Sequence, residues 1–170
     1  MALVSSSQVV TDQAATPAVK VTSIEKGGVV RTAQGFLAAA SYTGGTTAQW
    51  YTFVRLPTRA RVVGVFLTQA TTTTGAVKVG LYRPGGIAID DDCFAAIHVL
   101  GAATNIRARV DTLTVFTASL RQSDLATAFV TAIGTAGATG DAEFDIAAAI
   151  VTVIGTPTDA LMEVDYVLPE

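Results

Sequence analysis

Hydrophobic and polar residues alternate with a period of two over most of the chain after Gln49, which is the pattern of strands that bury one face. The last such stretch is the cleanest, because Met162 and Val164 alternate with Glu163 and Asp165. Turns that contain Gly or Pro separate the stretches. Strands are therefore expected from Trp50 up to Pro57 and over residues 61–69, 76–83, 106–116, 144–154 and 161–167.

The stretch 61–69 is apolar on both sides of the expected strand. Strict alternation places one set of side chains on one face and the other set on the opposite face, so both faces should be largely covered. The first set is Val63, Val65 and Leu67, and the second is Val62, Gly64 and Phe66.

Two segments depart from the period of two. Apolar residues spaced by four from Leu125 to Ile133, with a polar cap before them and a glycine after them, predict a short helix at residues 123–133. Segment 87–100 fits no period well. Its three consecutive carboxylates, Asp90–Asp92, suit either the start of a short helix or a solvated turn.

Many short strands, Gly and Pro turns and a single helix predict an all-β, mainly antiparallel fold, a jelly-roll-like β-sandwich with one short helix. Residues 1–45 differ from the rest, because they are rich in Ser, Thr, Gln and Ala and carry only short apolar pairs. They are expected to form an extended N-terminal arm ordered by contacts with the body or a neighbour, with a disordered tail as the alternative. The sandwich body is then residues 46–170.

The composition favours a protein that is covered by partners. Half of the residues are hydrophobic and 15% are charged, against about 25% charged in ordinary soluble domains. An inert surface of Ala, Thr and Gly is the alternative explanation. The net charge of −3 and the scattered cations argue against binding to nucleic acid or to an anionic membrane. With one cysteine no internal disulfide is possible, so the chain needs no oxidising compartment and synthesis in a cytoplasm is expected.

Catalytic chemistry has few candidate residues here. The chain has one His and one Cys, His98 and Cys93, which are five positions apart and lack further partners for a metal site or a nucleophilic pair. It has no Gly-x-Ser-x-Gly turn and no phosphate-binding loop. The sequence thus predicts no enzyme, no metal and no cofactor.

Two charged clusters are candidates for binding a partner. Asp90, Asp91 and Asp92 are adjacent, so they point in different directions and make a poor Ca²⁺ site; ion pairs with a neighbouring subunit's arginines are the preferred function. Arg55, Arg59 and Arg61 surround Leu56-Pro57 and can meet a partner's carboxylates, or they serve only solubility at strand ends.

A family resemblance is carried by the order of three motifs: Arg55-Leu56-Pro57-Thr58-Arg59-Ala60-Arg61-Val62-Val63-Gly64-Val65, then Val77-Lys78-Val79-Gly80-Leu81-Tyr82, then Asp90-Asp91-Asp92-Cys93-Phe94-Ala95. This order resembles small structural proteins encoded beside the major capsid gene of tailed bacteriophages. The segment Gly27-Gly28-Val29-Val30-Arg31 resembles their Gly-rich, Arg-containing stretch and adds Arg31 to the candidate partner-binding residues. The helix departs from the family, since it reads Leu125-Ala126-Thr127-Ala128-Phe129 where members often have Trp and paired Leu.

The resemblance implies a capsid decoration, or cement, protein on the outer surface of the virion. Such a protein binds the major capsid protein, assembles with itself as a dimer or trimer and bridges subunits of the expanded shell. Two other classes remain open. One is a head or tail fibre or adaptor, and the other is a carbohydrate-binding β-sandwich, for which Tyr42, Trp50, Tyr51 and Tyr82 are candidate contacts.

Overall fold

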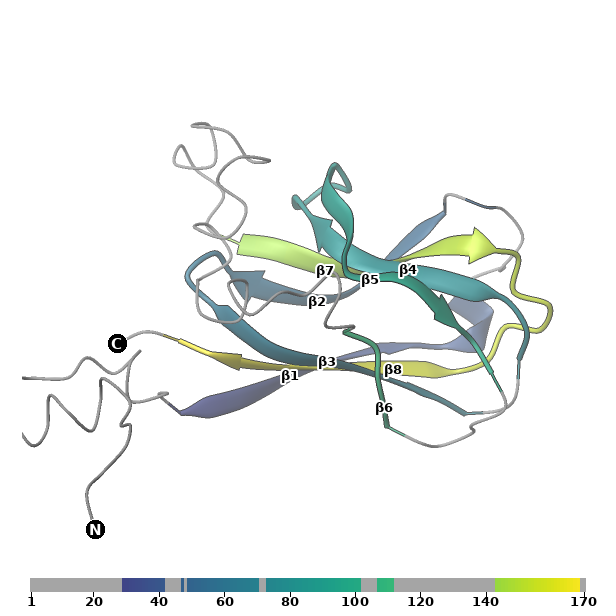
Figure 1. Ribbon diagram of the computed structural model, residues 1–170, viewed down its shortest axis with the longest axis horizontal. Coiled ribbons are helices and arrows are strands. Elements are labelled where there is room, and N and C mark those ends of the chain that lie inside the picture. Colours follow the sequence, from purple (N-terminus) through teal and green to yellow (C-terminus); the bar gives the residue numbers. More distant parts are fainter. Residues whose placement is uncertain are drawn as a thin grey trace, which may run out of the picture.

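The computed structural model describes residues 29–41, 47, 49–70, 73–101, 107–111 and 143–168. Within these ranges the chain forms two four-stranded antiparallel sheets, one with the strand order β1-β8-β3-β6 and the other β2-β7-β4-β5. The two sheets lie face to face as the layers of a β-sandwich (Figure 1). The strands are β1 (Val30–Leu37), β2 (Trp50–Pro57), β3 (Arg61–Gln69), β4 (Ala76–Tyr82), β5 (Ala88–Val99), β6 (Ala108–Arg109), β7 (Glu143–Thr152) and β8 (Ala160–Val167), with a 3-10 turn, η1 (Ala39–Ser41), after β1.

The strand pairs are nested in the sequence. The β4–β5 pair is innermost, and the β3–β6, β2–β7 and β1–β8 pairs enclose it in turn, all antiparallel. The β3–β8 and β4–β7 pairs then join these ribbons into the two sheets. The described strands therefore form one long hairpin, with its tip at the β4–β5 turn, wound into two layers.

The hydrophobic core lies between the inner faces of both sheets. Strand β7 is covered on both sides, since every residue from Phe144 to Ile150 is buried. On β8 the predicted alternation is confirmed, because Met162 and Val164 have no exposed surface while Glu163 and Asp165 face outward. The strands predicted from alternation therefore bury the expected face where no bulge interrupts them.

The prediction for β3 is wrong in one respect. Its pairing with β8 shifts between Val62 and Gly64, and this bulge changes which residues share a face. Val62, Val65 and Leu67 are consequently the residues of this strand that join the core cluster, and Val63 does not. Strict alternation cannot anticipate the extra residue.

Segment 87–100 contains a strand, β5, so the helix start considered for Asp90–Asp92 is wrong. The pairing of β5 with β4 is irregular: from Leu81 to Val79 β4 moves by two residues, whereas β5 moves by five, from Asp90 to Ala95. The additional residues form a wide bulge that carries the acidic cluster and Cys93. An extended strand with a bulge has no simple period, which explains why the sequence pattern was ambiguous here.

Several predictions fall partly or wholly outside the described residues. The helix at 123–133 does so entirely, as do residues 1–28 of the expected arm. Residues 30–37, which were assigned to the arm, form β1 and pair along their whole length with β8. Of the strand expected at 106–116, the structure describes a two-residue strand, β6, with its neighbours. Among the described residues, no helix is long and apolar enough to span a bilayer.

Gly80 should be essential for the close approach of β5 to β4. A Cβ at this position would lie 2.2 Å from the Asp91 carbonyl carbon and 2.3 Å from the Asp90 carbonyl oxygen, so β5 would have to move. Gly80→Ala is expected to lower the free energy of unfolding by about 1–3 kcal/mol, the range for overpacking, as measured by urea denaturation. Gly101→Ala, where the nearest atom would be 3.9 Å away, is the matched control, and equal losses in both variants would contradict this explanation.

Candidate interaction surface

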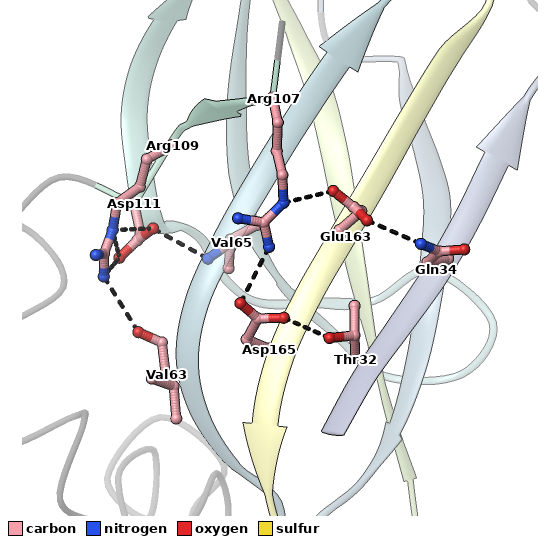
Figure 2. A network of polar contacts seen from close by, with 9 residues as sticks. All are labelled: Thr32, Gln34, Val63, Val65, Arg107, Arg109, Asp111, Glu163 and Asp165. Carbon is pink, nitrogen blue, oxygen red and sulfur yellow. Dashed lines mark hydrogen bonds and ion pairs between the residues drawn. The ribbon is translucent and has the colours of Figure 1, made fainter. Parts of the chain in front are cut away.

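A network of charged and polar side chains crosses the outer face of the β1-β8-β3-β6 sheet (Figure 2). The strand register brings its members into rows. Thr32 of β1 lies opposite Asp165 of β8, and Gln34 lies opposite Glu163. Phe66 of β3 lies opposite Glu163 on one side and Arg109 of β6 on the other. Residues far apart in sequence thus meet because alternate residues of each strand share this face.

Arg107 is at the centre of the network. Its Nε donates to Glu163 Oε2 at 2.6 Å and its Nη2 donates to Asp165 Oδ2 at 3.0 Å. The guanidinium also lies 3.3 Å from the centre of the Phe66 ring, in a cation–π contact. Burial lowers the pKa of Arg107, but the hydrogen bonds to both carboxylates outweigh it and raise the pKa overall. Arg107 is therefore a fixed cation in a set orientation.

The two carboxylates on β8 are also held from the β1 side. The Thr32 hydroxyl donates to Asp165 Oδ1 at 2.7 Å, and the Gln34 amide donates to Glu163 Oε1 at 2.8 Å. Each carboxylate therefore has one neutral and one cationic donor. These bonds link β1, β8 and the residue before β6 across the sheet, in addition to the backbone ladder.

Asp111 anchors the β6 segment to β3. Its side chain has no exposed surface, and its Oδ1 accepts the backbone N–H of Val65 at 3.0 Å. Arg109 donates to the same carboxylate through Nε and Nη2, and its Nη2 also donates to the Val63 carbonyl oxygen at 3.1 Å. The buried charge is thus paired and hydrogen-bonded, as buried charges in proteins generally are.

The surface that results combines fixed charges with exposed apolar residues. The side chains of Arg107 and Arg109 remain 42% and 46% exposed, so both can still contact a partner. On β1, Val30 and Phe36 are 55% and 66% exposed. Oriented charges beside apolar residues suit contact with another protein. Among the described residues no group of three His, Cys, Asp or Glu side chains could hold a metal ion.

The arginines predicted to bind a partner are divided between the two sheets. Arg55, on β2, makes a two-bond ion pair with Asp145 of β7 at 2.6 and 3.0 Å. Arg59 is exposed in the turn before β3, and Arg61 is partly buried at the start of that strand. Arg31 is exposed on β1. It lies at the same end of the sheet as Arg61, since Arg31 is opposite Tyr166 of β8 and Arg61 is opposite Val167. Arg55 thus has a partner within its own chain, and partner binding by the others stays a prediction.

The three aspartates of β5 are all partly buried. Asp91 forms an ion pair with Lys78 of β4. Burial raises the pKa of Asp90, and a hydrogen bond with the Asp92 side chain and the charges of Asp92 and Asp91 raise it further. The backbone N–H of Asp92, at 3.4 Å from Asp90 Oδ1, partly offsets this. Pairing of this cluster with a neighbour's arginines is not tested by these contacts.

The single cysteine and the single histidine of the sequence, Cys93 and His98, are on β5 and do not form an activated pair among the contacts described. Cys93 is 1% exposed, and burial raises its thiol pKa well above the usual value. Burial lowers the pKa of His98. A protonated, buried thiol is a poor nucleophile.

The network on the first sheet was not predicted as a site. The sequence did place Arg107 and Arg109 on one alternating stretch and Glu163 and Asp165 on another. Alternation alone showed that each pair shares a face. Which strands are neighbours depends on the whole topology, so the pairing between these two segments could not be derived.

The comparisons with known proteins give a likeness of fold. No protein-family model matches the chain, and no curated protein matches it. A chain in the solved structure of the capsid of Ralstonia phage GP4 has a TM-score of 0.53 and 14% identity, over 84% of this chain and 86% of that one. The capsid asymmetric unit of cyanophage Pam1 gives a TM-score of 0.42 at 17% identity, over 84% of this chain and 86% of that one. A chain in the acid-stable capsid of Helicobacter pylori bacteriophage KHP30 gives a TM-score of 0.40 at 18% identity, over 84% of this chain and 90% of that one. At these identities the GP4 match shows a shared fold.

Removing the Asp111 carboxylate should destabilise the protein more than removing Arg107. Asp111→Ala leaves the buried Val65 N–H without its acceptor, a loss of about 1–3 kcal/mol in the free energy of unfolding. Arg107→Ala breaks ion pairs at a partly exposed site, where the cost is under about 1 kcal/mol. Urea denaturation of both variants measures the difference. A larger loss of stability in Arg107→Ala than in Asp111→Ala would contradict the conclusion that Asp111 is the more important anchor.

Asp90→Asn should stabilise the protein at neutral pH. Because the folded-state pKa of Asp90 is raised, its ionised form is disfavoured in the folded state, and the wild-type chain gains stability as the pH falls through that pKa. The variant should therefore unfold at a higher temperature than wild type at pH 7, and the gap should close by about pH 3.5, below the unfolded value. Glu143→Gln, at an exposed carboxylate, is the control for the charge change. A difference in unfolding temperature that does not depend on pH would show that the ionised Asp90 carboxylate does not destabilise the folded state.

Proposed function

We propose that this chain is a virion structural protein that decorates the outer surface of an expanded bacteriophage capsid and stabilises it by bridging major capsid protein subunits. The observation that carries the proposal is the shared fold with a chain of the Ralstonia phage GP4 capsid over 84% of the sequence. The motifs of the sequence resemblance support it independently. They fall on β2–β3, β4 and β5, in the order expected.

The nested strand pairing supports the finer description of the fold as a jelly roll. A jelly roll is an eight-stranded double sheet with Greek-key connections, and it is common among viral capsid proteins. Pairing of the first strand with the eighth, the second with the seventh, the third with the sixth and the fourth with the fifth is what winding a single hairpin into two layers produces.

The proposed mechanism is physical and needs no catalytic group. Pressure from packaged genome pushes subunits apart. A protein that binds only the expanded lattice lowers the free energy of that lattice by mass action. A dimer or trimer with closed symmetry matches the symmetry axes of an icosahedral shell. The oriented cations on the β1-β8-β3-β6 face are the proposed contacts, together with the exposed Arg31 and Arg59.

The carbohydrate-binding alternative has less support. Sugar recognition would want open aromatic faces. Trp50 is 39% exposed, but it stacks on Tyr82, with ring centres 5.6 Å apart, and Tyr82 is only 3% exposed. Tyr51 packs partly against the core, and Tyr42 lies outside the described residues. A fibre or adaptor role shares the virion location with the main proposal and differs in copy number.

The N-terminal segment is proposed to reach a neighbouring subunit. Because β1 begins at Val30 and is paired throughout, a truncation that spares the sheet removes residues 1–28 only. That variant should keep the unfolding temperature of the full chain and bind expanded capsids at least about tenfold more weakly, a change of about 1.4 kcal/mol. Co-sedimentation with capsids that lack this protein measures the affinity.

Two controls make the co-sedimentation decisive. Unexpanded capsids should bind little of the full-length protein, because the proposed site exists only on the expanded lattice. Arg59→Ala tests one proposed contact in a chain whose sheets are intact. If the full-length protein sediments with neither form of the capsid, the decoration role is wrong; if the truncated chain binds as tightly as the full chain, the arm is not a contact.

A further inference from the structure

Strand β1 is an edge strand with one open side among the described strands. Its pairing with β8 runs from Val30 to Leu37 without a register shift, and β8 is the one described strand that pairs with it. Only alternate N–H and C=O groups of a strand point toward a given neighbour. The remaining groups of β1 therefore point outward from its open side, where a further strand can pair with them.

The other three edges of the two sheets carry features that oppose such pairing. Strand β2 has a bulge and ends at Pro57, which has no N–H to donate. Strand β5 shifts register three times and carries three aspartates, and β6 has two residues. Bulges, Pro, charges and short length are the usual protections of sheet edges. Among the described strands, β1 is the regular edge, with eight residues, no Pro, no bulge and one charge, Arg31.

The side chains of β1 add apolar surface to this open side. Val30 and Phe36, near the two ends of the strand, are each more than half exposed, as is Val29 just before it. Val30 and Phe36 are separated by an even number of residues from Thr32 and Gln34, so all four share the outer face that carries the polar network. Exposed apolar residues along an unprotected edge are suited to contact with another strand.

Strand β2 contacts β1 from its inner face and not along the open side. A Cβ at Gly35 would lie 1.9 Å from the Phe53 carbonyl oxygen. Cβ atoms point to the faces of a sheet, and Ala33 and Leu37, on the same face as Gly35, pack against the core. The backbone at Phe53 therefore lies against the inner face of β1 and supports the strand from within the chain.

We propose that β1 pairs antiparallel with β1 of a second copy about a twofold axis, which joins two sheets into one continuous sheet. A second copy is the occupant because the strand is complementary to itself. With Ala33 on the axis, Val30 faces the partner's Phe36 and Phe36 faces the partner's Val30, a pairing of β-branched and aromatic residues that sheets favour. Arg31 faces the partner's Gly35, so like charges are not opposite each other.

The neighbouring twofold registers fit less well. Residues directly opposite each other in an antiparallel pair share a face, so the axis passes through a residue position. An axis at Thr32 would place Val30 opposite Gln34 of the partner subunit. An axis at Gln34 would place Phe36 opposite Thr32 of the partner subunit. Both registers leave an exposed apolar residue against a polar one, whereas the axis at Ala33 matches apolar with apolar.

The polar network continues across the axis at Ala33. In this register Gln34 faces the partner's Thr32. The Gln34 amide donates one hydrogen to Glu163 and has a second to donate. The Thr32 hydroxyl donates to Asp165 within its own chain and keeps lone pairs that can accept. An amide–hydroxyl bond thus links the carboxylates of the two β8 strands, twice by symmetry.

This interface rests on the proposed function in that it takes up the dimer named there and adds the surface that forms it. A twofold pair of edge strands closes with two copies, so it gives a dimer and not a trimer. One strand pair is a small interface, and small interfaces give weak association that depends on concentration. The contacts involve no capsid protein, so the dimer should form in free solution.

The first test is sedimentation velocity of the full-length protein at concentrations from about 1 µM to about 1 mM. Monomer should convert to dimer as the concentration rises. A chain that stays monomeric over this range would overturn the proposal, and so would a trimer. Binding to expanded capsids is measured separately, so the decoration role and this interface can each fail while the other holds.

Charge variants test the register. Val30→Lys and Phe36→Glu each place a charge against an apolar residue of the partner and should weaken the dimer at least about tenfold. The double variant places the new cation opposite the new anion at both sites, so its dissociation constant should return to within about threefold of wild type. The two positions are about 20 Å apart along one strand, so the charges cannot meet within one chain. Ile97→Lys, at a similarly exposed residue of edge strand β5, is the matched control.

Three results with these variants would contradict the proposal. Single variants that dimerise as well as wild type would show that β1 is not the interface. A double variant that stays as weak as the single variants would show that Val30 does not face the partner's Phe36. Equal weakening by Ile97→Lys would show that the effect is not specific to β1. The substituted residues are exposed, so every variant should keep the unfolding temperature of the wild-type chain.

Discussion

The packing of two inner sheet faces into one shared core is the constraint on which the rest of the structure depends. Strand β7 pairs with both β2 and β4, and every residue from Phe144 to Ile150 is buried. Because the innermost hairpin, β4–β5, and the outermost pair, β1–β8, are nested around this core, the sheet order follows from the winding of a single hairpin. The outer face of the β1-β8-β3-β6 sheet does not contribute to this core, and it carries the charged network.

The sequence predicted the regular parts of this fold well, for a clear physical reason. A strand that buries one face must alternate, so Met162, Val164, Glu163 and Asp165 could be assigned to faces from the sequence alone. Irregular pairing has no such signature. Because of the bulge in β3, Val62 and not Val63 joins the core cluster with Val65 and Leu67. The bulge in β5 interrupts the alternation at three aspartates, so the sequence pattern did not indicate a strand there.

The candidate site was predicted less well than the fold, because a site depends on which strands are neighbours. Arg55 was proposed for a partner, yet it lies opposite Asp145 and pairs with it within the chain. Arg107 is bound to carboxylates more than fifty residues away, Glu163 at a separation of 56 and Asp165 at 58. Composition favoured contact with a partner, which stays a prediction, and it could not say which face would make that contact.

The proposed function, binding to other subunits of a capsid, was argued from the polar network, the exposed apolar residues of β1 and the fold shared with a phage capsid chain. The most direct measurement of this claim is the copy number of the chain in purified virions, relative to the major capsid protein, after removal of the tails. A decoration protein predicts a ratio of one or a simple fraction of one. A few copies per particle, loss with the tails, or absence from the virion would contradict it.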